Sequence, residues 1–299
     1  MAYLTMLNEM MDQDLECAIA ALTELGIRHL DLKTHVFGRS IEDLDAERRQ
    51  QLAALLERTN TEVYCFSSVL GHQNVARVAE REFRQTLEQG VSNLLQTAAY
   101  VRPTVVRLLG CYFDNRQDWT DGNDYLERHA AWVYPVYREA IEQVAEAGLL
   151  VTLENEPNSI FSGPGETCGF FERLDLGEKA RFTWDIQNMW ESGVYPTLDV
   201  YHELRNITNY VHLKGGRSVS ATPQIMRYRS PLDEASWPVT EIVSQVLADG
   251  ISPVLCLNAS HGSPPPDYSL GSLWDTAELV PAEARRDVAF LRRTFSEIS

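Results

Sequence analysis

The stretch that decides the fold is Leu149-Leu150-Val151-Thr152-Leu153-Glu154-Asn155-Glu156-Pro157. Its run of apolar residues is typical of a strand that is buried on both faces, in a parallel sheet covered by helices. The run ends in the carboxylate of Glu154, and a loop containing Pro157 follows at once. Parallel α/β folds place their chemistry at this carboxyl end of the strands. We therefore expect Glu154 to lie at a functional site.

Two later stretches have the same design, namely Phe182-Thr183-Trp184-Asp185 and Tyr210-Val211-His212-Leu213-Lys214. Apolar strands and amphipathic helices alternate along all 299 residues, which predicts a single-domain (β/α)8 TIM barrel over residues 1–299. The alternative is a doubly wound open sheet, which is weakened by the lack of a Gly-x-Gly-x-x-Gly and of a Walker-type loop. The eight predicted strands span residues 3–7, 27–32, 63–66, 105–109, 149–154, 182–185, 210–213 and 254–257.

The predicted helices follow the strands at helical spacing. One is expected over residues 41–59 with Ser40 as its cap, a long one over 75–99, and another over 197–205. Residues 215–237 are expected to be a long loop that acts as a lid or a subunit contact. Long loops of this kind favour a homo-oligomer.

Composition limits the partners and the compartment. A net charge of -17 and a mean hydropathy of -0.26 argue against nucleic acid and anionic membranes as partners, because both need a basic surface. There is no apolar run of the roughly 20 residues that a membrane helix needs, and the first residues do not have the pattern of a secretory signal. The five cysteines show no Cys-x-x-Cys spacing, which favours a reducing compartment. We expect a cytoplasmic protein.

In a barrel, the last residues of strands five to eight face one mouth, and here they are Glu154, Asp185, His212 and Asn258. Two carboxylates and an imidazole suit a divalent metal, and Asn258 would add a neutral oxygen. Manganese is the first expectation, with cobalt, magnesium, iron or zinc as alternatives.

These segments resemble the sugar isomerase/epimerase superfamily with the xylose-isomerase-like barrel. Leu153-Glu154-Asn155-Glu156 is similar to its strand-five motif, whose first Glu binds metal, and Asp185-Ile186-Gln187-Asn188-Met189 to its strand-six motif. Val211-His212-Leu213-Lys214-Gly215 resembles its His-x-Lys-Asp motif. Here Gly215 replaces the Asp, and Asn258 replaces a Glu that the family uses as both ligand and acid/base.

The resemblance implies proton abstraction next to a carbonyl on a sugar or cyclitol, with Glu154 or Glu156 as base and Lys214 or a histidine as acid. Because Asn258 cannot abstract a proton, two-base epimerisation is disfavoured, whereas one-base isomerisation and elimination stay open. Further side chains are expected at the same mouth as substrate-binding groups: Lys33, His35, His72, Arg107, Asn188 and His261. Arg107 is expected either to pair with a carboxylate near the metal or to contact substrate oxygens.

Two other classes remain open. One is a non-catalytic or partner-dependent barrel with a degenerate metal site, which Asn258 leaves open because it stands where the family has a Glu. A metal-dependent hydrolase of the endonuclease IV kind is disfavoured, because it needs more ligands and a cationic surface.

Overall fold

The computed structural model describes residues 2–219, 222–258 and 279–298. In these residues eight strands form one sheet in the order β1-β10-β7-β6-β5-β4-β3-β2, and every neighbouring pair is parallel. The bounds of the strands are Tyr3–Met6 (β1), His29–Leu32 (β2), Glu62–Ser67 (β3), Val105–Leu109 (β4), Leu150–Glu154 (β5), Ala180–Asp185 (β6), Thr208–Leu213 (β7) and Val254–Leu257 (β10).

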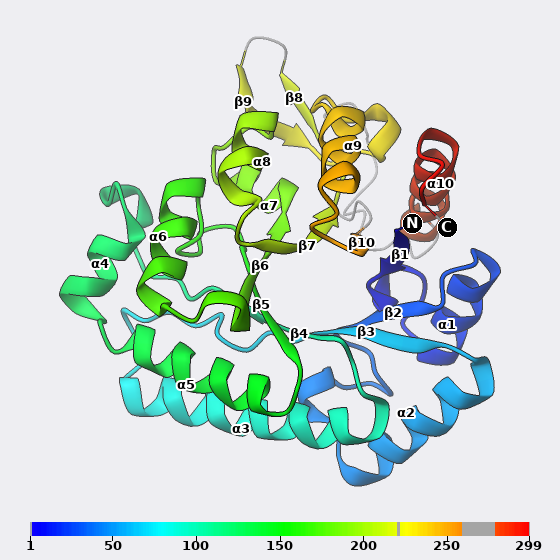
Figure 1. The fold of residues 1–299 in the computed structure, drawn as a ribbon, viewed down its shortest axis with the longest axis horizontal. Coiled ribbons are helices and arrows are strands. Elements are labelled where there is room, and N and C mark those ends of the chain that lie inside the picture. The colour runs from blue at the N-terminus through cyan, green and yellow to red at the C-terminus, as the bar shows by residue number, and fades with distance from the viewer. Residues whose placement is uncertain (1, 220–221, 259–278, 299) are drawn as a thin grey trace.

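The two edges of this sheet meet, because a parallel bridge joins Leu7, just after β1, to Asp31 in β2. Helices surround the strands on the outside (Figure 1). The (β/α)8 TIM barrel is therefore confirmed. The helices are Leu15–Glu24 (α1), Ala46–Thr59 (α2), Glu80–Val101 (α3), Gly122–His129 (α4), Val133–Glu146 (α5), Pro164–Leu174 (α6), Ile186–Glu191 (α7), Leu198–Leu204 (α8), Val239–Asp249 (α9) and Leu279–Thr294 (α10).

The core lies between this outer layer and the strands. Helix α5 is representative, since Tyr137, Ile141 and Val144 are fully buried and recur at the spacing of one helical face. The ends of the chain come together beside α10 (Figure 1), where the backbone N–H of Ala2 donates to Glu297 O at 2.8 Å. In the described residues no helix is long and apolar enough to cross a membrane.

Two of the predicted helix starts were wrong. The segment expected to begin at residue 41 first forms a short 3-10 turn over Ile41–Asp43, and α2 is capped by Asp45 rather than by Ser40. The Asp45 carboxylate accepts a hydrogen bond from the Arg48 backbone N–H at 3.0 Å, which satisfies an otherwise unpaired donor of the first turn. Helix α3 begins at Glu80 and not near residue 75.

The predicted loop over residues 215–237 was also partly wrong, because it contains an antiparallel hairpin. Its strands are Arg217–Val219 (β8) and Thr222–Tyr228 (β9), and they are paired with two register shifts. The hairpin projects from the barrel next to α7 and α8 (Figure 1). Helix α7 was not predicted either, since six residues are too few for a clear helical period.

Candidate metal centre

The period of two along a strand points alternate side chains into the barrel. On β5 these are Thr152 and Glu154, and on β6 Thr183 and Asp185. The hydroxyl of Thr183 donates to that of Thr152 at 2.7 Å, which shows that the two strands present the same layer. Glu154 and Asp185 therefore form the next layer towards the mouth.

Glu154 is buried and paired with two side chains. Oε2 lies 3.0 Å from Nε of Arg107 on the neighbouring strand β4, and Oε1 lies 2.9 Å from Nδ1 of His212. Burial alone would raise the pKa of Glu154, but Arg107 and His212 outweigh it and hold that pKa well below its usual range. Of the two roles expected for Arg107, pairing with a carboxylate of the site is the one observed.

Asp185 has two separate tasks for its two carboxylate oxygens. Oδ1 accepts the backbone N–H of Asn188 at 2.9 Å and so caps α7, and Oδ2 lies 2.7 Å from Nζ of Lys214. Asn155 fixes the backbone here, because its side chain accepts from Asp185 N and donates to Asp185 O, both at 2.9 Å. The residue directly after Glu154 thus aligns the ends of β5 and β6.

His212 completes a set of three fully buried side chains. Each of Glu154, Asp185 and His212 offers one ligand atom, and these atoms lie within 4.8 Å of one another. They come from three adjacent strands, β5, β6 and β7. The structure therefore brings the three predicted metal ligands together, and their binding of a metal stays a prediction.

Asp185 Oδ2 and His212 Nδ1 have partners in Lys214 Nζ and Glu154 Oε1. The other ring nitrogen of His212, Nε2, and Asn258 Oδ1 are buried and have no hydrogen bond from the described residues. Buried polar atoms are rarely left in this state. Carboxylate and imidazole atoms are also ligands that divalent metals accept. The residues present thus fit a divalent cation.

The charged side chains around these three candidate ligands also favour a bound cation. The carboxylates of Glu154, Asp185, Glu156 and Asp31 outnumber the two cations Arg107 and Lys214. Burial and then the negative charge of Glu154 raise the pKa of Glu156, and burial raises the pKa of Asp31. A bound cation would offset this effect of burial, because a nearby positive charge favours the ionised form of a carboxyl group.

Asn258 lies one residue beyond the pair Leu257–Leu213 that ends β10. Its backbone N–H donates to Leu213 O at 3.1 Å, and its side chain is almost fully buried. This is the strand-end position expected from the sequence, and the role of Asn258 as a neutral ligand stays a prediction.

Gly215 departs from the family motif for a steric reason. A Cβ at this position would lie 2.0 Å from the carbonyl oxygen of Ser230 and 2.5 Å from that of Pro231. Both neighbours are backbone, so neither moves aside easily. The Asp that the motif has here does not fit this chain.

We expect Gly215→Ala to lower the free energy of unfolding by about 3 kcal/mol, because overpacking against rigid backbone forces the chain apart. Urea unfolding followed by circular dichroism measures the change. Gly165→Ala is the matched control, since Gly165 is exposed in the first turn of α6 and a Cβ there meets nothing within 4 Å. Equal stability of the two variants would contradict the steric argument.

The other predicted site residues have structural partners. Lys33 and His35 both lie near the Glu9 carboxylate, with nitrogen–oxygen distances of 3.5 and 3.8 Å. His72 has Nδ1 3.1 Å from Gly110 O. Asn188 donates to Asn155 O at 2.9 Å and to Glu156 Oε2 at 3.2 Å. Their roles towards a substrate stay predictions, and His261 lies outside the described residues.

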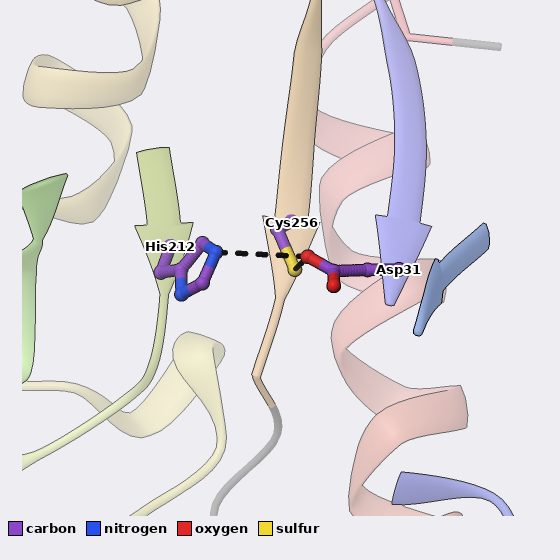
Figure 2. Close-up of side chains that lie close together, drawn as sticks. All are labelled: Asp31, His212 and Cys256. Carbon is purple, nitrogen blue, oxygen red and sulfur yellow. Dashed lines mark hydrogen bonds and ion pairs between the residues drawn. The ribbon is translucent and has the colours of Figure 1, made fainter. Parts of the chain in front are cut away.

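Asp31 is a buried residue of the site that the sequence reasoning missed. It interrupts the apolar run Leu30-Asp31-Leu32, just as Arg107 interrupts the apolar strand over residues 105–109. Tyr210 and Cys256 contact its carboxylate, and its Oδ2 lies 3.8 Å from Nε2 of His212 (Figure 2). The sequence does not mark Tyr210 or Cys256 as site residues, because each is a residue type that is common in a buried core.

No family model and no curated protein matches the chain. Solved structures match over nearly its whole length. The probable 3-DHS dehydratase of Bacillus anthracis is 16% identical, with a TM-score of 0.68 over 98% of this chain and 99% of that one. The 3-keto-D-glucoside 4-epimerase of E. coli is 15% identical, with a TM-score of 0.67 over 98% and 99%.

A third match is a xylose-isomerase-like TIM barrel protein of Mycobacterium smegmatis in complex with magnesium. It is 14% identical, with a TM-score of 0.65 over 93% of this chain and 88% of that one. The chain has the xylose-isomerase-like barrel fold. This confirms the fold that the sequence motifs imply, while identities this low leave the reaction open.

Proposed function

We propose that this protein is a divalent-metal-dependent isomerase, epimerase or lyase that removes a proton next to a carbonyl of a sugar or cyclitol. The observation that carries the proposal is the convergence of Glu154, Asp185 and His212, with ligand atoms within 4.8 Å of one another. The three matched structures support it, since two are named for epimerase or dehydratase activity and the third holds magnesium.

Glu154, Asp185 and His212 would hold the cation, with Asn258 as a fourth, neutral ligand. When bound, a divalent cation polarises the substrate carbonyl and stabilises negative charge that develops on it. Manganese is our first choice among the metals that suit this donor set.

Glu156 is the better base of the two candidates. Glu154 is held ionised by Arg107 and His212 and is buried between them, so its affinity for a proton is low. The pKa of Glu156 is raised by burial and by the charge of Glu154, which favours uptake of a proton. Asn188 donates to Glu156 Oε2 at 3.2 Å and orients the carboxylate.

Lys214 is the proposed acid. Its ammonium lies 2.7 Å from Asp185 Oδ2 and donates to Asn188 Oδ1 at 3.1 Å. An ammonium has three N–H donors, so one remains for a substrate oxygen. Asn258 offers no base for the opposite face of the substrate, and this favours one-base isomerisation or elimination over two-base epimerisation.

Metal binding and proton exchange test the proposal. Protein stripped with a chelator should bind one Mn²⁺ in isothermal titration calorimetry. The loaded protein should exchange the C–H proton next to the carbonyl of D-tagatose or of an inosose for deuterium from D2O, followed by proton NMR. Exchange should be lost in Glu156→Gln while Mn²⁺ binding is kept.

One observation favours a second candidate, a barrel that has lost the metal. Arg107 and Lys214 already neutralise one carboxylate each, Glu154 and Asp185. A protein of this kind would bind no Mn²⁺ and exchange no proton. Elemental analysis of the purified protein separates the two candidates. The net charge of -17 favours neither nucleic acid nor a nuclease activity.

A further inference from the structure

The main chain that carries Lys214, the proposed acid, packs against residues 230–237, which we call the backing segment. At one end of this segment, the carbonyl oxygen of Ser230 would lie 2.0 Å from a Cβ placed on Gly215. At the other end, the indole N–H of Trp237 donates to Lys214 O at 3.2 Å. A shift of the backing segment would therefore move the backbone from which the Lys214 side chain extends.

Helix α10 holds the backing segment through one buried carboxyl group. Oδ1 of Asp287, on α10, accepts the backbone N–H of Leu232 at 2.7 Å, and both residues are buried. Oδ2 of Asp287 has no hydrogen-bond partner among the residues that the structure describes. Burying a carboxyl group with so few partners is costly, which indicates a role for its bond to Leu232.

A second link between α10 and the backing segment lies at the surface. Arg286 donates to Asp233 at 3.0 Å and to Glu234 at 2.6 Å, but its side chain is 45% exposed. Exposed ion pairs contribute little to stability. The buried bond of Asp287 is therefore the stronger of the two contacts.

We propose that Asp287 is a positioning residue for Lys214, because it holds the backing segment against the backbone of Lys214 and Gly215. The Lys214 ammonium lies 2.7 Å from Asp185 Oδ2 and needs a fixed place to present its remaining N–H to a substrate oxygen. The inference rests on the proposed function in one respect, the role of Lys214 as acid. It adds a residue of an outer helix to the groups on which the reaction depends.

The bond to Leu232 does not need a charge on Asp287. Burial above all, together with the charges of Glu283 and Asp233, raises the pKa of Asp287 to about 7. Near neutral pH much of the protein therefore carries a neutral carboxyl group here, and its Oδ1 still accepts the Leu232 N–H. Asn has the same shape and the same acceptor without a charge, so Asp287→Asn should keep the contact.

The test compares Asp287→Leu with Asp287→Asn. Leu branches at the same atom as Asp but has no acceptor, so the Leu232 N–H loses its partner and the backing segment loosens. The chain has three lysines, Lys33, Lys179 and Lys214, and 13C labelling gives each a side-chain NMR signal. The signal of Lys214, assigned by its absence in Lys214→Arg, should move in Asp287→Leu and stay in place in Asp287→Asn.

Controls decide whether the effect belongs to Asp287. Lys33 and Lys179 should keep their signals in every variant. Arg286→Gln removes the exposed link between α10 and the backing segment and should leave the Lys214 signal as in the wild type. An equal change in Arg286→Gln and Asp287→Leu, or in Asp287→Asn and Asp287→Leu, would overturn the proposal. If Asp287→Leu does not fold, Asp287→Ser replaces it, since its hydroxyl is one atom too short to reach the Leu232 N–H.

Proton exchange gives the second readout. At saturating substrate, the exchange rate should fall about 10- to 100-fold in Asp287→Leu, because a small misplacement caused far from the chemistry can cost that much. Asp287→Asn should restore the wild-type rate. A loss of the same size in both variants would show that the charge of Asp287 matters and not its acceptor.

The proposed function and the role of Asp287 fail differently, because the Lys214 signal needs neither metal nor substrate. If wild type exchanges no substrate proton, the proposed function falls, and the signal still decides whether Asp287 positions Lys214. If wild type exchanges the proton but Asp287→Leu changes neither the signal nor the rate, the proposed function stands and the role of Asp287 falls.

Discussion

Arg107→Met should lower the free energy of unfolding by about 3–5 kcal/mol, the cost of leaving one partner of a buried ion pair without the other. The side chains of Arg107 and Glu154 are 2% and 3% exposed, so water cannot replace the missing guanidinium. Among the described residues, the Glu154 carboxylate would keep His212 and Lys214 as favourable neighbours. Guanidinium chloride unfolding at neutral pH measures the loss.

A double-mutant cycle separates this ion pair from the packing of the arginine side chain. Glu154→Gln alone should also destabilise, because it leaves Arg107 buried beside a neutral amide. The double variant Arg107→Met/Glu154→Gln should lose less than the sum of the two, with a coupling of about 2 kcal/mol. Strict additivity would show that the pair contributes no coupling energy.

Arg49→Met is the matched control for the loss of a buried arginine. Arg49 is also largely buried, but its partners are the neutral groups Thr97 Oγ1 at 3.2 Å and Gln96 Oε1 at 2.7 Å. Its removal leaves no charge behind, so the expected loss is about 1–2 kcal/mol. A loss as large as that of Arg107→Met would assign the effect to packing.

The barrel could be predicted because its signals are local. Each strand of the sheet is an apolar run, and the residue that ends the run is by construction at the mouth. Glu154 and Asp185 follow directly from this rule. His212 and Lys214 follow from it together with the period of two, which points both inward. No knowledge of distant contacts is needed for any of the four.

The pairings at the mouth could not be predicted, because they depend on which strands are neighbours and at what register. From the sequence, Arg107 could either pair with a carboxylate or contact substrate oxygens. The β4–β5 register, which pairs Arg107 with Thr152, brings its side chain to Glu154. Asp31 and His212 are 181 positions apart, and only the closure of the barrel brings them together. Lys214 was expected as an acid at the mouth, but its contact with Asp185 was not.

The hairpin β8–β9 and the short helix α7 were missed for a different reason. The hairpin has two register shifts, so its side chains do not alternate regularly. Helix α7 depends on the Asp185 cap and has six residues, fewer than two turns. Elements of this kind are set by tertiary contacts such as that of Gln187 Nε2 with Gly215 O at 2.8 Å.

Asp185→Asn should reduce the affinity for Mn²⁺ by at least about 100-fold, since even a residue that only supports a ligand contributes 10- to 100-fold. It should also abolish proton exchange with substrate. The change removes one negative charge and one ligand oxygen, and Lys214 Nζ keeps its hydrogen bond to Asn188 Oδ1 at 3.1 Å. Asn is as good a helix cap as Asp, so the amide can still accept the Asn188 backbone N–H and start α7.

Asp45→Asn is the control that isolates the charge at the mouth. Asp45 caps α2 through the Arg48 backbone N–H at 3.0 Å, in the same way that Asp185 caps α7, but it lies on an exposed helix start. It should change neither the Kd for Mn²⁺ nor the exchange rate. If Asp185→Asn also bound Mn²⁺ like the wild type, Asp185 would be only the partner of Lys214 and a cap. The second candidate, a barrel that has lost the metal, would then explain the site better than a metal-dependent enzyme.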